Sequence, residues 1–563
     1  MVVDRDVWIP MGDGVRLQAD VYRPDDRQRH PVLLQRTPYN RRDSFAVVVS
    51  AGIEPLRAVE QGYVVVIQDT RGRFGSEGAF QPFQQEADDG ADTIGWLAEQ
   101  AYCNGRIGMY GASYYAATQL LAATRRPEAL KAIAPKATAA DYFDSWFYHG
   151  GALQLGFSMY WALGLAAAEA ARRAAAGEDT SAELNELEAW LNDPARAFGT
   201  RPLIARGALN AMLPDFEAWL TRERDDVFWR SISVSDRWSA IDIPALHIGG
   251  WYDLFLRGTI ANYVGMAQHA PDQELLVGPW AHAVEYDALG EVEFGPGASA
   301  AALDMTRVHL EFFDRHLGDA PPAVDRPAAK VFAMGSNRWV GHSRWPPAEA
   351  ETQSLWLTGP ADDGRKRLCD GRPRDAQPSS NFTFDPADPV PTIGGATFLP
   401  GAYIGLHAGP RDQRPTQHRQ DVLTFTGPAL DAPLTIAGSV TVELYAATSA
   451  KDTDFTAKLV DVRPDGRALL ICDGIVRRSH VAGGAPEGGV DRYEIDLGHT
   501  YYVLGPGHRL QLDVSSSNFP RFDVNPNHGG DVARAREADY VVARQRVFHD
   551  AEHASRLLLE VLR

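Results

Sequence analysis

Cysteine is scarce in this chain of 563 residues, which contains Cys103, Cys369 and Cys472 and no others. An odd number at wide spacing argues against a disulfide framework and against a zinc site, so we expect no metal. Positive charge is also in the minority, because 55 Lys and Arg face 74 Asp and Glu for a formal net charge of −19. No basic cluster offsets this charge, which disfavours nucleic acid and anionic membranes as partners.

Long hydrophobic runs are absent too. No stretch approaches the ~20 apolar residues of a membrane span, and the N-terminal residues 1–6 are charged where a signal peptide needs an apolar core. We therefore expect no membrane partner and, by default, a cytoplasmic location. With 45% hydrophobic and 23% charged residues, the composition is that of an ordinary globular protein. At roughly one domain per 150 residues, the length predicts two to four domains.

The first part of the chain alternates strand and helix patterns. A turn at Gly12–Gly14 joins two alternating runs into an opening hairpin. Buried parallel strands and a helix follow, the strands at 31–35, 63–68, 107–110 and 130–134 and the helix at 86–100. Strand runs resume at 244–250 and 274–280. We assign residues 1–141 and 239–350 to two parts of one α/β domain.

Two other stretches differ from this pattern. Residues 142–238 are helix-rich with no strand runs, and their many aromatic residues fit either a plain helical core or a lid over a pocket; their place in the chain favours an inserted helical cap. Residues 351–563 show short alternating runs separated by Gly, Pro and Asp turns and no long helix. That pattern predicts an all-β sandwich, plausibly a jelly roll, with one strand expected at 539–542.

The strongest functional signal lies around Ser113. A short strand is expected to end at Tyr110, and a helix to start at Tyr114, so Ser113 occupies a sharp turn behind Gly111 and Ala112. Such a turn lifts the hydroxyl clear of the sheet, and the helix N-terminus supplies N–H groups for an oxyanion. This is a nucleophile elbow, with Tyr115 where the second glycine is usual. Because Gly-x-Ser also occurs in plain turns, the motif alone leaves catalysis open.

A nucleophilic serine needs an acid and a base, which follow it in the chain order Ser, Asp, His in α/β-hydrolases. Asp253 follows the strand run 244–250, and His282 follows the run 274–280, 29 residues later. The interval fits one helix and one strand. A turn or helix cap at Asp253 and a solvated loop at His282 are the competing interpretations. We interpret His247 as a buried, hydrogen-bonded histidine and His149 as a residue that lines the pocket without chemistry.

Six motifs follow one another in order along nearly the whole chain: Arg36–Tyr39, Asp69–Gly78, Gly105–Tyr114, Gly250–Asp253, Gly278–His282 and Met334–Trp339. Together they resemble the cocaine esterase and X-Pro dipeptidyl-peptidase family of α/β-hydrolases, which also contains α-amino acid ester hydrolases and glutaryl acylases. The resemblance implies an α/β-hydrolase fold with an inserted helical cap and a C-terminal jelly-roll domain.

The resemblance also implies roles for single residues. Ser113 would be the nucleophile, His282 the general base and then acid, and Asp253 the acid that orients the histidine. The oxyanion donors would be the hydroxyl of Tyr39 and the backbone N–H of Tyr114. A phenol beside the elbow suits this role, because it can donate to a developing alkoxide. Asp69 and Arg71 are expected to form a buried pair that braces the loops beneath the elbow.

The residues after the orienting acid, Leu254 and Phe255, are apolar, whereas the amino-ester hydrolases of the family carry acidic residues nearby. With Phe157 and Trp161 from the cap, we expect an apolar or aromatic acyl pocket. The prediction is a serine carboxylesterase that acts on a small-molecule ester through an acyl-enzyme, with no cofactor.

Two other functions stay open. The first is a peptidase or acylase with the same triad, of the X-Pro dipeptidyl-peptidase or α-amino acid ester hydrolase type. The second is an idle binding protein, against which the complete triad argues. The sequence leaves the oligomeric state open, a homo-oligomer included.

Overall fold

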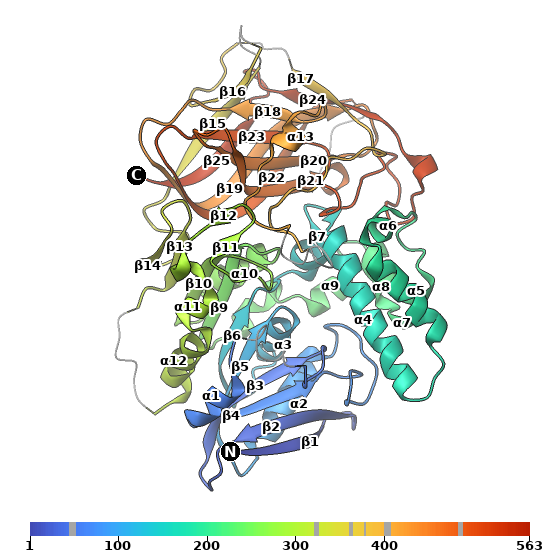
Figure 1. Ribbon diagram of the computed structural model, residues 1–563, viewed down its shortest axis with the longest axis vertical. Coiled ribbons are helices and arrows are strands. Elements are labelled where there is room, and N and C mark those ends of the chain that lie inside the picture. The colour runs from blue at the N-terminus through green and yellow to red at the C-terminus, as the bar shows by residue number, and fades with distance from the viewer. Residues whose placement is uncertain (44–51, 320–325, 360–363, 376–378, 399–406, 482–487) are drawn as a thin grey trace.

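The computed structural model describes the chain except residues 44–51, 320–325, 360–363, 376–378, 399–406 and 482–487 (Figure 1). Within the described residues, ten strands form one sheet in the order β1-β2-β4-β3-β5-β6-β9-β10-β13-β14. Their bounds are β1 Val2–Pro10, β2 Arg16–Arg23, β3 His30–Thr37, β4 Val64–Asp69, β5 Cys103–Ala112, β6 Leu130–Lys136, β9 Ala245–Tyr252, β10 Gln273–Ala281, β13 Ala329–Ala333 and β14 Arg338–His342. The strands from β4 to β13 run parallel, so the expected α/β sheet with its opening hairpin is confirmed.

Both faces of this sheet are buried because the strands are apolar at successive positions. Val32 and Leu34 of β3 pack with α2 (Glu86–Ala98) and α3 (Tyr114–Ala123). Leu33, between them, faces the other way and packs with α1 (Pro55–Glu60) and α12 (Met305–Leu317). Two further helices, α10 (Leu256–Met266) and α11 (Ala300–Leu303), follow β9 and β10. Unbroken apolar runs are typical of parallel strands covered on both sides.

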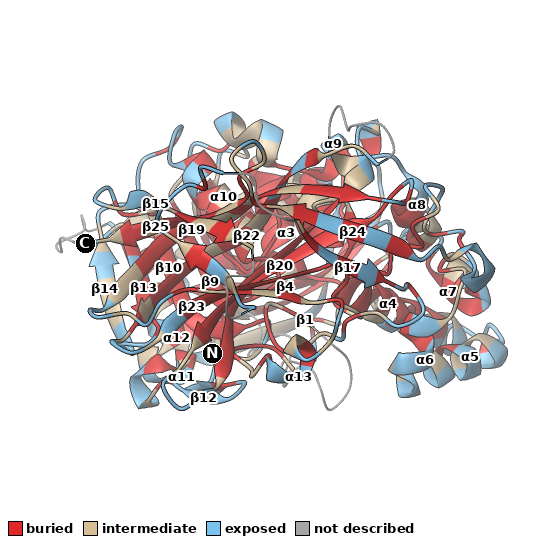
Figure 2. Ribbon diagram, turned by 90° about the horizontal axis from the view of Figure 1, so that it is seen from above, coloured by how far each residue is buried: buried red, intermediate tan, exposed pale blue. Residues whose placement is uncertain are grey.

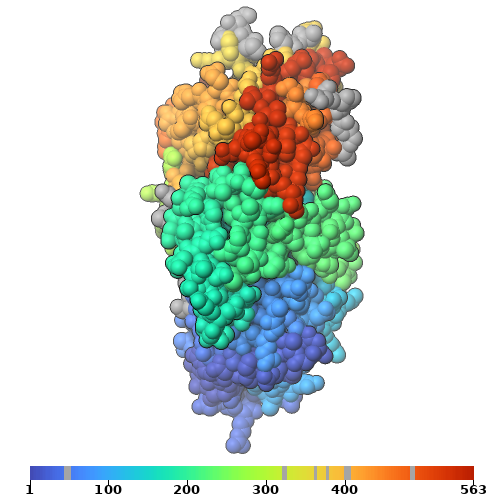
Figure 3. Space-filling view, turned by 90° about the vertical axis from the view of Figure 1, so that its right-hand side faces the viewer, coloured from blue at the N-terminus to red at the C-terminus, as the bar shows by residue number. Residues whose placement is uncertain are grey.

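A helical segment separates β6 from β9 in the chain. It contains η2 Phe143–Phe147, α4 Leu155–Ala175, α5 Ser181–Asn192, α6 Pro194–Gly199, α7 Gly207–Met212, α8 Asp215–Thr221, α9 Val227–Ile232 and η3 Ser235–Ala240. A short hairpin with two residues in each strand, β7 Tyr148–His149 and β8 Ala152–Leu153, departs from the expectation of no strands. In the space-filling view this segment lies between the N-terminal and C-terminal parts of the chain (Figure 3).

The C-terminal part is all-β apart from α13 Arg414–Gln417 and short 3₁₀ turns, among the residues described. Its sheet joins β15 Glu351–Thr358, β16 Lys366–Cys369, β17 Ser380–Phe384, β18 Leu423–Thr426, β19 Leu434–Thr448, β20 Asp454–Val462, β21 Ala468–Arg477, β22 Asp491–Leu504, β23 Arg509–Ser515, β24 Ala543–Phe548 and β25 Arg556–Leu562. Buried residues concentrate in both large sheets, whereas α5 and α6 are exposed at the rim (Figure 2).

The strand expected at 539–542 is wrong. Residues 537–539 form a 3₁₀ turn, and β24 begins only at Ala543. Val541 and Val542 are exposed, so this apolar pair lies on the surface and pairs with no neighbouring strand. In the described part of the chain, no helix is long and apolar enough to cross a membrane.

A buried arginine ties the C-terminal part to the helical segment. Arg477, at the end of β21, donates to Asp454 Oδ1 (2.8 Å) and to Asp523 Oδ1 (2.9 Å). Asp523 also accepts from the backbone N–H of Leu153 (2.9 Å), and the Arg477 N–H donates to the Gly150 carbonyl (2.8 Å). Burial raises the pKa of Asp454 to about 6 even though Arg477 opposes it. The arginine therefore compensates two buried carboxylates at once.

We predict that Arg477→Met destabilises the protein by about 3–5 kcal/mol, because it leaves the buried carboxylates without their cation. Chemical denaturation monitored by tryptophan fluorescence measures this loss. Arg125→Met is the matched control: its partner is Asp88 and both side chains are exposed, so it should cost at most about 1 kcal/mol. Equal losses in the two variants would contradict the prediction.

Candidate active site

Ser113 occupies the turn between β5 and α3 in a strained conformation, with φ 59° and ψ −121°. Its N–H donates to the Lys136 carbonyl (2.8 Å), and its carbonyl accepts from the N–H of Ala116 (3.0 Å) and Ala117 (3.1 Å). The turn is thus fixed to β6 on one side and to α3 on the other. Positive φ in a residue other than glycine costs free energy and concentrates at functional sites. The backbone N–H of Tyr114 is one of the first helical amides, which lack a partner within the helix.

His282 and Asp253 lie together at the ends of neighbouring strands. His282 Nδ1 is 3.0 Å from Asp253 Oδ2, and both side chains are buried. The other carboxylate oxygen accepts from the Phe255 N–H (2.8 Å), so Asp253 also shapes the turn before α10. A carboxylate at Nδ1 places the imidazole proton there and leaves Nε2 as the acceptor.

The two phenylalanines beside His282 come from different parts of the chain, Phe255 from the turn before α10 and Phe398 from the C-terminal part. The His282 ring meets Phe255 and Phe398 edge-on, with centroids 5.1 and 5.3 Å away.

An apolar cavity of about 480 Å³ is lined by Ser113 and His282 together with several aromatic residues. Its wall includes Ser113, His282, Tyr39, Phe157, Trp161 and Phe398. Within the described residues, the Ser113 hydroxyl forms no hydrogen bond, and the bond to a catalytic base is often long in the absence of substrate. Leu254 and Phe255 are buried behind this wall and do not line it; Phe255 stacks on Trp146 (4.3 Å).

A second cavity of about 730 Å³ also borders His282. It shares Ala112, His282 and Ala283 with the apolar cavity. Its wall is more highly charged and carries the ion pairs Lys136–Glu285 and Arg57–Asp304. The histidine therefore stands where an apolar cavity and a charged cavity meet.

Tyr39 and Tyr114 both lie near the elbow but present different groups to it. Tyr39 lines the apolar cavity, and its hydroxyl accepts a hydrogen bond from Trp161 Nε1 (2.8 Å). Burial raises its pKa to about 12, against the opposing effects of Trp161 and the charge of Arg73, so the phenol stays protonated at neutral pH. The Tyr114 hydroxyl instead donates to Glu86 Oε1 (2.8 Å) and accepts from the Phe83 N–H (2.9 Å). Only its backbone N–H is left for an oxyanion.

The structure tests three expectations about residues near the site: the Asp69–Arg71 pair, His149 and His247. Asp69 and Arg71 are both buried but do not pair: Asp69 binds Arg41, and Arg71 binds Asp89 and Asp13. The chain turns between them, because the Arg73 N–H bonds the Thr70 carbonyl (3.1 Å), and the turn directs Arg71 toward α2.

The two other histidines have structural partners. His149 lines neither cavity at the active site; it contacts the Asp496 carbonyl (3.0 Å), because its hairpin packs on the C-terminal part, and burial lowers its pKa. The interpretation of His149 as a pocket residue is therefore wrong. His247 is buried 3.1 Å from Gln273 Oε1, with its pKa lowered to about 4 by burial, which confirms the expectation for it.

Sequence reasoning missed three residues near the site. Phe398 covers His282 from the C-terminal part, and nothing in its local sequence marks it. Arg73 lines the apolar cavity and lies inside the quoted motif Asp69–Gly78, which was the available signal. Gln119, fully buried on α3, donates to the Gly111 carbonyl (3.0 Å) and accepts from the Ala134 N–H (3.0 Å), which braces the elbow. No group of three or more His, Cys, Asp or Glu suited to a metal ion occurs in the described ranges.

Comparison with known proteins covers the whole chain. Residues 13–284 match the family described as X-Pro dipeptidyl-peptidase (S15 family), and residues 322–558 match the X-Pro dipeptidyl-peptidase C-terminal non-catalytic domain. Cocaine esterase of Rhodococcus sp. (strain MB1 Bresler) is 37% identical over 576 residues, which cover 100% of this chain and 99% of the relative.

Solved structures show the same fold. An α-amino acid ester hydrolase is 26% identical with a TM-score of 0.83, over 100% of this chain and 96% of that one. An aminopeptidase from the marine sediment archaeon Thaumarchaeota archaeon is 26% identical with a TM-score of 0.84, over 100% of this chain and 97% of that one. The α/β-hydrolase-type fold with a C-terminal all-β domain is therefore shared by proteins similar to this chain.

The elbow itself generates a prediction. Gly111 has φ 126°, and an added Cβ would lie 2.6 Å from Tyr115 Cβ. We expect Gly111→Ala to destabilise the protein by about 1–3 kcal/mol and to displace Ser113, because the backbone must change to accept a side chain. Thermal unfolding together with the rate of labelling by a fluorophosphonate measures both effects.

Gly95 provides the control. It lies inside α2, and a Cβ added there meets nothing within 4 Å. Gly95→Ala should raise stability by up to about 1 kcal/mol and leave labelling unchanged. A Gly111→Ala variant that unfolds and labels like the wild type would show that the elbow tolerates another backbone conformation.

Proposed function

This chain belongs to the family of α/β-hydrolases that contains cocaine esterase and the X-Pro dipeptidyl-peptidases, it is a serine hydrolase, and we propose that it cleaves carboxylic esters through an acyl-enzyme. One observation carries the proposal: His282, which is hydrogen-bonded to Asp253, shares the wall of one apolar cavity with the strained Ser113. Those are the parts that nucleophilic catalysis requires.

In the first half-reaction, Ser113 Oγ attacks the ester carbonyl carbon while His282 Nε2 takes the hydroxyl proton. Asp253 stabilises the imidazolium through Nδ1–H. The negative charge on the carbonyl oxygen is met by the Tyr39 hydroxyl and the Tyr114 N–H. When the tetrahedral intermediate collapses, the bond to the alcohol oxygen breaks, and His282 returns the proton to that oxygen. Water then attacks the acyl-enzyme by the same route and releases the acid.

The two cavities would bind different parts of the substrate, one the acyl group and the other the alcohol. Phe157, Trp161 and Phe398 surround the apolar cavity next to Ser113, which suits a neutral aliphatic or aromatic acyl group. The leaving alcohol must lie against His282 to receive its proton, and the charged cavity borders that histidine. The helical segment, residues 142–238, then acts as a cap whose α4 supplies part of the acyl site. The domain limits at 1–141, 239–350 and 351–563, and a jelly-roll arrangement of the last, belong to the same proposal.

An aminoacyl substrate is the alternative, and Asp43 is the observation that favours it. Asp43 stands in the wall of the apolar cavity, where a carboxylate would attract the ammonium group of an aminoacyl ester or peptide. The buried guanidinium of Arg73 stands in the same wall and would repel that ammonium. The opposed charges favour a neutral acyl group.

A substrate panel tests this choice. It comprises nitrophenyl esters of rising acyl length, a nitrophenyl benzoate, an alanine ester and an alanyl-proline anilide, each assayed on the wild type and on Asp43→Asn. We expect turnover of the neutral esters, with little effect of the variant. Preference for the anilide or the amino ester, lost in Asp43→Asn, would establish the alternative.

We predict that Ser113→Ala abolishes covalent labelling by a fluorophosphonate and lowers kcat at least ~10⁴-fold, because the nucleophile is gone. Ser158→Ala is the control, since the buried Ser158 hydroxyl has no partner among the described residues and its loss breaks no hydrogen bond. Labelling of Ser113→Ala at another serine would assign the nucleophile elsewhere.

Asp253→Asn should lower kcat about 10⁴-fold, because an amide cannot hold the imidazole in the right tautomer or stabilise its cation. The amide oxygen can still accept from the Phe255 N–H, so the melting temperature should change little. Steady-state kinetics and a melting curve on the same sample separate these effects. A variant that keeps most of the wild-type rate would reduce Asp253 to a turn residue.

A further inference from the structure

The hydrogen bond between Trp161 and Tyr39 has a fixed direction. An indole N–H can only donate, so the phenol oxygen of Tyr39 accepts at 2.8 Å. The proton of a phenol prefers the plane of its ring and therefore has two favoured positions. Because Trp161, on α4, donates to one of these positions, the Tyr39 proton is left the other, and Tyr39 lines the cavity that also contains Ser113. Trp161 thereby selects one orientation of the hydroxyl.

Arg73 links the two segments that carry these rings. Its Nε donates to the carbonyl of Pro38, the residue before Tyr39 (3.0 Å), and its Nη1 donates to the carbonyl of Leu165, one turn after Trp161 on α4 (3.4 Å). Arg73 is 2% exposed, so burying this cation costs desolvation free energy. Burial lowers its pKa to about 10, which keeps it charged at neutral pH. The same charge favours proton donation by Tyr39, since it lowers the pKa of the phenol against burial.

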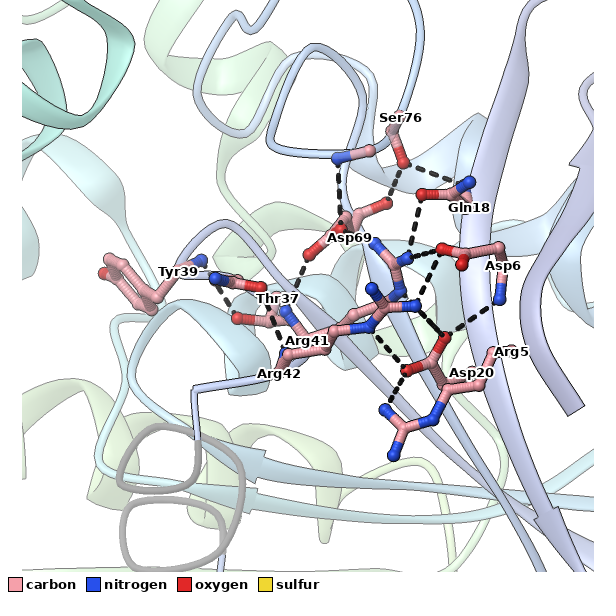
Figure 4. A network of polar contacts seen from close by, with 12 residues as sticks. Arg5, Asp6, Gln18, Asp20, Thr37, Tyr39, Arg41, Arg42, Asp69 and Ser76 are labelled. Atoms are coloured by element: carbon pink, nitrogen blue, oxygen red, sulfur yellow. Dashed lines mark hydrogen bonds and ion pairs between the residues drawn. The ribbon is translucent and has the colours of Figure 1, made fainter. Parts of the chain in front are cut away.

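Tyr39 and Arg41 of this loop are also held through their backbone by residues of β3 and β4. The Tyr39 N–H donates to Thr37 Oγ1 (3.0 Å), and the Arg41 N–H donates to Asp69 Oδ1 (2.7 Å). The Arg41 side chain continues into a network with Asp69 and Asp20, from which the Tyr39 ring points away (Figure 4). This network fixes the backbone but touches no atom of the phenol. The contacts that orient the hydroxyl come from the helical segment.

We propose that Trp161 and Arg73 are positioning residues for the oxyanion donor: Trp161 orients the Tyr39 hydroxyl, and Arg73 fastens the Tyr39 loop to α4. The proposal rests on the ester hydrolysis proposed above. In this proposal both the sheet and the helical segment contribute to the oxyanion hole. The hole is therefore complete only when α4 is packed against the Tyr39 loop.

A double-mutant cycle tests the role of Trp161. Tyr39→Phe should lower kcat ~10²–10³-fold, as expected when one oxyanion donor is lost. Trp161→Phe keeps an aromatic ring in the wall but removes the N–H, and we expect kcat to fall about tenfold. In the Tyr39→Phe background no hydroxyl remains to be oriented, so the same change should lower kcat less than twofold. A slow nitrophenyl or alkyl ester whose acylation limits kcat is the substrate.

Trp219→Phe is the matched control. Trp219 stacks on Trp161 at 5.4 Å, and its buried Nε1 has no hydrogen-bond partner in the described part of the chain. The same deletion therefore removes ring area beside the site but no hydrogen bond. We expect a wild-type kcat for this variant, with melting curves confirming that both tryptophan variants are folded.

Arg73→Lys tests the second contact. Lysine keeps the charge but cannot reach both carbonyls with one planar group, so kcat should fall severalfold while KM for a short acyl ester stays within about twofold. This loss should also vanish in the Tyr39→Phe background. Equal effects of Trp161→Phe or Arg73→Lys in both backgrounds would overturn the proposal and make these residues parts of the pocket wall.

The outcomes also separate this proposal from the esterase assignment. A Tyr39→Phe variant with wild-type kcat would remove the donor that is being positioned and end the proposal. It would leave the assignment intact as long as Ser113→Ala is inactive and unlabelled. If a fluorophosphonate did not label Ser113 in the wild type, the esterase assignment itself would be wrong.

Discussion

The site depends on one constraint, the fixed turn at Ser113 between β5 and β6. The Ser113 N–H bonds the last residue of β6, which holds the residue at positive φ and aims its side chain beyond the end of the sheet. β5, β6, β9 and β10 are consecutive neighbours in the sheet and run parallel. Their carboxyl ends therefore lie at one edge, where Asp253 and His282 follow β9 and β10 directly. The order of Ser113, Asp253 and His282 along the chain therefore becomes their order along this edge, and no additional loop folding is needed to bring them there.

This geometry explains which features could be predicted from sequence. Each residue of the proposed triad follows an apolar strand run, so its place depends on local pattern and on the rule that parallel strands share an edge. The opening hairpin, the parallel strands and the helix at 86–100 could also be predicted, because each depends on the local pattern of apolar and turn residues. His247 was also recognisable, because it lies inside such a run and its ring has to find a buried partner, here Gln273.

The features that sequence could not supply depend on contacts between distant segments. Phe398 reaches His282 from the C-terminal part, and His149 is drawn away from the site by a carbonyl of β22. Arg71 is separated from Asp69 by a backbone turn that residue types alone do not specify. Val541 and Val542 have the composition of a strand but no neighbouring strand with which to pair. For Phe398 and His149 the deciding partner lies far away in the chain, whereas Arg71 is decided by a local turn and the two valines by the absence of a partner strand in the described residues.

In the proposed mechanism, the two contacts of Trp161 couple the choice of substrate to the rate of acylation. Its ring forms part of the wall around the acyl group, while its N–H holds the Tyr39 hydroxyl. A smaller residue at this position would enlarge the cavity but release the proposed oxyanion donor, Tyr39, so a broader acyl range would come with slower acylation. Phe157 and Phe398 line the same cavity, and their side chains have no group that could hydrogen-bond to the phenol oxygen. The proposed acyl site can therefore be reshaped at these two positions without removing the hydrogen bond from Trp161 to the Tyr39 hydroxyl.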